Sequence, residues 1–140
     1  MPILNYTTKV DVYTTIGAIQ GNLVKHGAKK IVQDYDDSGK ITALCFLIDT
    51  PCGPQGIRLP ANAAAVQKVL EKQKVKCDME QAERVAWRIV KDWVEAQMAI
   101  LESQMVTVDQ IFLPYMMNDQ GQTVYELFRE NRLQLTGGTN

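Results

Sequence analysis

The longest periodic run of apolar residues in the chain spans residues 78–105, which contain no glycine and no proline. Apolar side chains recur there every three or four positions, the spacing that predicts an α-helix. Asp78 and Gln81 predict a capping box at its first turn. One apolar stripe contains Val85, Ile89, Trp93, Ala96 and Ile100, and a second contains Ala82, Ala86, Val90, Val94, Met98 and Met105. Because a surface helix usually buries a single stripe, we expect this helix to pack both on its own domain and on a second copy of the chain.

Upstream of this helix, the pattern changes to short apolar runs separated by breakers. Residues 3–11 predict a strand, and a helix capped by Thr14 or Thr15 is expected to end at Gly27. Residues 28–35 and 40–49 are strand-like runs around a polar turn that contains a glycine, which indicates a hairpin. Residues 56–59 predict a third strand that ends at Pro60.

The remaining segments predict helices. One is expected to open at Pro60 and to run to residue 72, and another covers residues 108–117, where Pro114 predicts a short or kinked helix. Residues 123–132 predict a final amphipathic helix, and residues 133–140 are expected to lack regular structure. This order predicts an α+β fold: a small antiparallel sheet packed on helices, with the long helix at an oligomer interface. The length of 140 residues predicts a single domain, residues 1–140.

Composition narrows the function classes. The chain is 46% apolar and 22% charged with a net charge of −1, a globular mixture that lacks the cation density of DNA-binding proteins. No run of 18 apolar residues predicts a membrane span, and the first residues do not resemble a signal peptide. The three cysteines match no metal-binding spacing, so we expect reduced thiols in a cytoplasm.

The sequence offers little for catalysis. Its one histidine, His26, falls at the end of a predicted helix, where a structural role is the simpler interpretation. The segment from Asp34 to Gly39 matches the first half of a calcium loop, but position 12 of that loop is Cys45 and the flanks predict strands. We therefore favour a polar hairpin turn, and we expect no catalytic residue, no metal and no cofactor.

Two features suit an anionic ligand. Arg58 closes a predicted strand just before a helix start that carries Asn62, so a phosphate there could meet a guanidinium and free backbone N–H groups together. On the long helix, Arg84, Arg88 and Asp92 share one face beside Trp87 and Trp93. Arginines with neighbouring indoles suit a nucleotide. The simpler alternatives are a solvated Arg58, a capping Asn62, a solvated helix face and tryptophans in the core, and we favour the core for Trp93.

Several segments resemble a known family. These are LPAN at residues 59–62, ERVAWRIVKDWVEAQ at residues 83–97, FLPY at residues 112–115 and GQTVY at residues 121–125. Together they are similar to the first-described Thoeris anti-defence proteins of phages and prophages, and the segment from the long helix is the specific part of the likeness.

The resemblance implies a binding protein without catalysis. Such proteins sequester a cyclic ADP-ribose isomer (gcADPR) that a bacterial TIR-domain immune protein makes, and some members resemble traps for cyclic di- or trinucleotides. It further implies a homodimer or homohexamer in the host bacterial cytoplasm, with the ligand near the subunit interface. The residue types that such a ligand needs are present at Arg58, Asn62, Arg84, Trp87, Arg88, Asp92 and Arg129.

Two other functions stay open at this point. The chain could be a non-catalytic helical dimer that serves as a protein–protein interaction module through the long helix. It could also be an enzyme that cleaves a nucleotide with a divalent metal on Asp34, Asp36 and Asp37.

Overall fold

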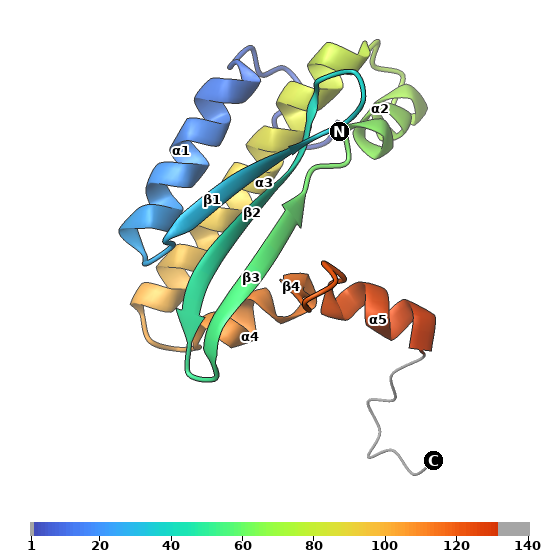
Figure 1. Ribbon diagram of the computed structural model, residues 1–140. Helices are drawn as coiled ribbons and strands as arrows, with labels where there is room; N and C mark the ends of the chain where they lie inside the picture. Colours follow the sequence, from blue (N-terminus) through green and yellow to red (C-terminus); the bar gives the residue numbers. More distant parts are fainter. Residues whose placement is uncertain (1, 132–140) are drawn as a thin grey trace.

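Figure 1 shows the computed structural model of the protein, which describes residues 2–131. The elements in chain order are α1 (Val12–Lys25), β1 (Lys30–Tyr35), β2 (Ile41–Thr50), β3 (Gly53–Pro60), α2 (Ala63–Lys72), α3 (Met79–Glu102), α4 (Val108–Phe112), the 3-10 turn η1 (Leu113–Tyr115), β4 (Met116–Met117) and α5 (Val124–Asn131). The predicted α+β class is confirmed. The segment 133–140, expected to be irregular, lies outside the described residues.

The four strands form an antiparallel sheet in the order β1-β2-β3-β4. The predicted hairpin is confirmed, because Asp36 accepts hydrogen bonds from the backbone N–H groups of Ser38 and Lys40 and Gly39 supplies a positive φ of 83°. Within β3, only Gly56 and Ile57 pair with β4. The end of β3, from Arg58 to Pro60, is therefore a free edge, where a proline is tolerated because no partner strand needs its missing N–H.

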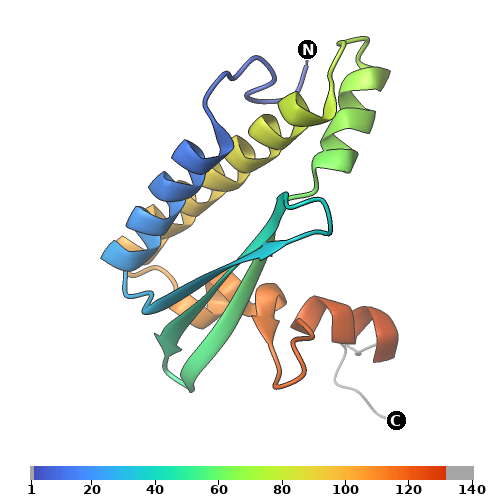
Figure 2. The ribbon, with the colours of Figure 1, turned by 45° about the horizontal axis from the view of Figure 1, so that its top comes forward.

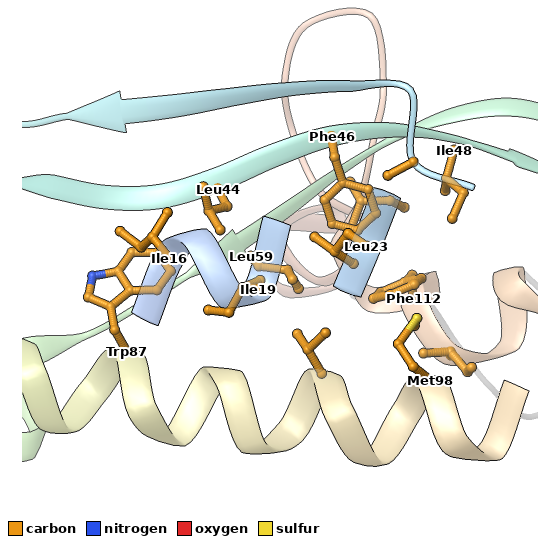
Figure 3. Close-up of a cluster of buried hydrophobic side chains, with 14 of the residues drawn as sticks. Ile16, Ile19, Leu23, Leu44, Phe46, Ile48, Leu59, Trp87, Met98 and Phe112 are labelled. Carbon is orange, nitrogen blue, oxygen red and sulfur yellow. The ribbon is translucent and has the colours of Figure 1, made fainter. Parts of the chain in front are cut away.

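The sheet and the helices α1 and α3 form two layers, as Figures 1 and 2 show. Alternation along β2 directs Leu44, Phe46 and Ile48 toward these helices, and all three side chains are buried. They meet Ile16 and Ile19 of α1 in a continuous core (Figure 3). Among residues 2–131, no helix combines the length and apolar character needed to cross a bilayer.

The long helix begins and ends close to where the sequence predicts. Asp78 caps α3 by accepting a hydrogen bond from the Gln81 N–H at 2.8 Å. The Gln81 side chain does not complete the capping box, since its amide donates to the carbonyl groups of Tyr6 and Thr8 instead. In the second stripe, Ala82, Ala86, Val94 and Met98 are buried against the domain, and Val90 is half-buried. Met105 lies beyond the end of α3 and is 70% exposed. In the other stripe, Val85 is fully buried. Ile89, Trp93 and Ile100 are half-buried and Ala96 is exposed.

The N-terminal segment corrects one prediction. Residues 3–11 form no strand; they form an irregular segment that is tied to α3 by a 2.7 Å hydrogen bond from the Asn5 amide to Asp92. Asn5 has a φ of 64°, which breaks an extended backbone, and the apolar positions of this segment do not alternate as a strand requires.

Three helix boundaries and one strand also differ from the predictions. Asp11, not Thr14 or Thr15, caps α1, by accepting from the Tyr13 N–H. Pro60 ends β3 instead of opening α2, which begins at Ala63 behind the cap Asn62. The helix predicted for residues 108–117 stops at Phe112, and Pro114 lies in the 3-10 turn that follows. The next two residues form β4, which the sequence did not predict.

His26 fastens the end of α1 to the end of α3. Its Nδ1 lies 2.8 Å from the carbonyl oxygen of Asn22, and its Nε2 lies 2.6 Å from a carboxylate oxygen of Glu102. Both partners are acceptors, so the imidazolium form, which donates at both nitrogens, satisfies both contacts. The predicted structural role at a helix end agrees with this position.

We expect His26→Ala to lower the free energy of unfolding by about 1 kcal/mol, because one partly exposed charged contact and one backbone contact are lost. Urea unfolding of this variant beside Lys25→Ala, an exposed neighbour, measures the effect. Equal midpoints for the two variants would contradict a structural role for His26.

Candidate functional site

Two surface grooves meet at the free end of β3. The hairpin groove, about 590 Å³, lies between the β1–β2 turn, the start of β2, the end of β3, and the beginnings of α2 and α3. The tyrosine groove, about 440 Å³, lies between the same end of β3, η1 and the start of α5. Arg58 and Pro60 line both grooves, so the grooves adjoin at these two residues. Their volumes lie in the range of small-molecule sites.

Arg58 is the charged group at this junction. It pairs in register with Cys45, and its Nε lies 3.3 Å from a carboxylate oxygen of Asp34. The Arg58 side chain is 34% exposed. In the described part of the chain only the Nε of this guanidinium is hydrogen-bonded, which leaves its two Nη groups for an anionic ligand.

Asn62 places the start of α2 in the hairpin groove. Its side-chain oxygen accepts a hydrogen bond from the Ala65 N–H at 3.0 Å. The first N–H groups of a helix have no intrahelical partner, and the first two helical residues, Ala63 and Ala64, line the groove. The positive end of the helix dipole adds to their attraction for an anion.

The opposite wall of the hairpin groove is occupied by an ion pair. Lys40 donates to Glu83 at 2.7 Å, and this hydrogen bond raises the pKa of the lysine. Glu83 and Asp36 add negative charge on that side of the groove. An anion is therefore favoured only on the side formed by Arg58 and the first turn of α2.

Cys45 lies beside Arg58 and pairs with it in register. Burial raises the pKa of its thiol to about 11, and a hydrogen bond from Sγ to Asp34 adds to the shift. The thiolate is the reactive form of cysteine. At neutral pH the Cys45 side chain therefore acts as a weak donor that orients Asp34.

The tyrosine groove contains aromatic residues that sequence reasoning missed. Tyr115 is half-buried and contacts Trp93 edge to face, with ring centroids 5.6 Å apart. Tyr125 is 51% exposed, and its hydroxyl accepts a hydrogen bond from Arg129 at 3.0 Å. The Arg129 guanidinium also lies 6.0 Å from the centre of the Tyr125 ring. Arg129, predicted from the sequence, thus reaches the groove only through Tyr125.

The cluster predicted on the long helix lies elsewhere. Arg84 donates to the Gln81 side chain, Arg88 reaches Thr15 of α1 at 3.5 Å, and Asp92 accepts from Asn5. These contacts direct the cluster toward α1 and the N-terminal segment. The structure therefore brings Arg58 and Asn62 together at the hairpin groove, whose lining includes neither Arg88 nor Asp92. Arg84 lines a neighbouring groove of about 240 Å³, which shares Lys40, Ile41 and Glu83 with the hairpin groove.

Trp87 corrects the assignment of the two tryptophans. Its side chain is 1% exposed and projects from α3 toward Ile16 and Leu44 (Figure 3). It has no free face on which a base could stack. Trp93, expected in the core, is half-buried at its margin and contacts Phe112 with centroids 5.9 Å apart. Trp93 also lines a smaller apolar groove of about 180 Å³ with Pro60 and Tyr115.

The aspartates of the calcium-like segment do not converge. Asp36 is held in the hairpin turn, where hydrogen bonds from Ser38 and Lys40 lower its pKa. Asp34 faces Arg58 on the sheet. Within residues 2–131, no group of three or more histidine, cysteine, aspartate or glutamate side chains is placed to hold a metal ion.

Comparison of the chain with protein-family models, curated proteins and solved structures finds no match.

Proposed function

We propose that the protein binds a small phosphate-bearing nucleotide where the two grooves meet and holds it without converting it. The observation that carries the proposal is the placement of Arg58, which lines both grooves beside the first turn of α2 and, among residues 2–131, has two guanidinium nitrogens without a hydrogen-bond partner. Phosphate oxygens suit the guanidinium and the N–H groups of Ala63 and Ala64. The neighbouring tyrosines supply flat apolar walls for a ring.

The resemblance supplies the candidate ligand, a cyclic ADP-ribose isomer made by a TIR-domain immune protein. This ligand carries a pyrophosphate, two riboses and an adenine. The grooves offer a cation, hydroxyl and amide groups, and aromatic rings, which are the matching partners. The protein would sequester the signal in the host bacterial cytoplasm, and cyclic di- and trinucleotides form a second ligand class to test.

The residues at the site support binding over turnover. The Cys45 thiol is protonated at neutral pH, and His26 is occupied at the far ends of α1 and α3. Asp34, the nearest carboxylate to Arg58, is engaged by the guanidinium and by Cys45. None of these groups resembles a nucleophile activated by a base.

A retention assay tests this function. The protein is incubated with cyclic ADP-ribose isomers, freed of unbound ligand, heat-denatured, and the released material is identified by mass spectrometry. Intact nucleotide supports sequestration, and an altered nucleotide supports an enzyme. Retention of no cyclic nucleotide would contradict the proposal and leave an interaction module as the remaining function.

That second candidate is favoured by one observation on α3. Ile89, Trp93 and Ile100 are half-buried and Ala96 is exposed, so this apolar stripe is not fully used by the chain itself. A second copy could cover it and give the predicted homodimer or homohexamer. The same apolar stripe could instead contact a different protein, as an interaction module requires.

We expect Ala96→Arg to convert an oligomer to a monomer, because a charge at the centre of the stripe cannot be buried without a partner. Native mass spectrometry measures the change, with Ala18→Arg on the exposed side of α1 as the control. An unchanged oligomer in the Ala96 variant would place the subunit interface away from this stripe.

A further inference from the structure

The tyrosine groove combines fixed walls with one oriented carboxylate. Tyr115 is braced by Trp93, and Pro60 and Pro114 add rigid apolar surface. Tyr125 is held by Arg129. The braced Tyr115 wall loses little conformational freedom when a flat ring enters. The groove is therefore suited to an aromatic ring, and its polar groups decide which ring.

Glu126 is the polar group that can select among rings. One of its carboxylate oxygens accepts the Thr123 N–H at 3.0 Å, and the Thr123 hydroxyl accepts the Glu126 N–H at 3.1 Å. This reciprocal pair fixes the direction of the carboxylate at the start of α5. In the described part of the chain, its second oxygen has no hydrogen-bond partner.

The charge on Glu126 makes that second oxygen a pure acceptor. The N–H of Thr123 lowers the pKa of Glu126, and the positive charge of Arg58 lowers it further. An ionised carboxylate accepts hydrogen bonds and donates none. It favours a ring edge that presents an amino group over one that presents only a C–H group.

We propose that the tyrosine groove is a nucleobase subsite that selects a purine whose exocyclic amino group donates to Glu126. The base lies against the tyrosine rings, and the phosphates that follow it lie at Arg58, which lines the same groove. This inference rests on the proposed nucleotide-binding function, and it adds the identity of the base.

Three probes test the phosphate site at Arg58 separately from the base subsite at Glu126. Adenosine 5′-phosphate carries the amino group, purine riboside 5′-phosphate lacks it, and ribose 5-phosphate lacks the base. NMR titration of the protein with each probe measures even millimolar binding. We expect adenosine 5′-phosphate to bind about 10-fold or more tightly than purine riboside 5′-phosphate, the discrimination typical of one charged hydrogen bond.

Glu126→Gln tests the carboxylate. The Thr123 N–H retains the amide oxygen of the new side chain, which turns its NH₂ group toward the groove as a donor. We expect this variant to lose the preference for the amino purine and to bind ribose 5-phosphate at least as tightly as the unaltered protein, because the substitution removes a negative charge that interacts with Arg58. Glu130→Gln, another exposed glutamate of α5, is the control and should keep the preference.

The results distinguish failure of the base subsite, failure of the role of Glu126 and failure of the proposed function. If ribose 5-phosphate binds and neither purine binds more tightly, the base subsite is wrong and the anion site at Arg58 stands. Equal binding of the two purines, or a preference that survives Glu126→Gln, overturns the role of Glu126. If none of the three probes binds, both the subsite and the proposed function are contradicted.

Discussion

Replacement of Arg58 by alanine is expected to lower nucleotide retention by about 10- to 100-fold without unfolding the protein. Charged hydrogen bonds contribute about 1.5–3 kcal/mol each, and about 1.4 kcal/mol corresponds to tenfold in affinity. The substitution also leaves the Asp34 carboxylate, now without its cation at 3.3 Å, beside the junction of the two grooves. Its negative charge would repel a phosphate.

The fold should tolerate this change, because an ion pair that is about one-third exposed contributes little to stability. Equilibrium dialysis against a cyclic ADP-ribose isomer measures the affinity, and circular dichroism checks the fold. Arg88→Ala is the matched control, since Arg88 contacts Thr15 between α1 and α3. A larger loss of affinity for Arg88→Ala than for Arg58→Ala would indicate that the ligand binds at the cluster on α3 instead.

Replacement of Trp87 by alanine is expected to destabilise the protein by about 3–5 kcal/mol, the usual cost of emptying a large buried side chain from a core. Trp87 is 1% exposed and belongs to the cluster that joins α1, α3 and the sheet. Since small domains have a total stability of about 5–15 kcal/mol, this loss would unfold a measurable fraction of the molecules. Urea unfolding measures it.

Tyr13→Ala, at a site 54% exposed, is the control and should change stability by less than about 0.5 kcal/mol. Trp87→Phe distinguishes a role of Trp87 in core packing from a role in ligand binding, because phenylalanine keeps most of the packing. We expect this variant to retain nucleotide as the unaltered protein does. Lower retention with unchanged stability would show that Trp87 contacts the ligand, as the sequence first suggested.

The sequence predicted α3 and the β1–β2 hairpin, because residues close together in the chain determine both. The α3 helix follows from its periodicity and the Asp78 cap, and the hairpin follows from the turn that Asp36 and Gly39 form. The strand predicted for residues 3–11 failed because a strand needs a partner, and this segment is tied to α3 by side chains instead. β4 was missed because two residues become a strand only by pairing with Gly56 and Ile57, which are distant in sequence.

The candidate site was predictable only where its residues are close in sequence. Arg58 and Asn62 flank Pro60, so the strand end and the helix start could be read together. The tyrosine groove joins β3 to η1 and α5, a contact between distant segments that no local pattern indicates.

The spacing of apolar residues along α3 indicates which of the two tryptophans is buried. Trp87 precedes Val94 by seven residues and Met98 by eleven, spacings that put all three side chains on one face of α3. That face is the one buried against the domain. Assigning Trp87 to the stripe of Val94 and Met98 would have placed it in the core.

The most direct test of nucleotide binding at Arg58 is a backbone-amide NMR titration with a cyclic ADP-ribose isomer. We expect the largest shifts at Arg58, Ala63 and Ala64, with smaller ones at Tyr115 and Tyr125. Shifts confined to Arg84 and Arg88, or no shifts at saturating ligand, would contradict a site at the junction of the two grooves.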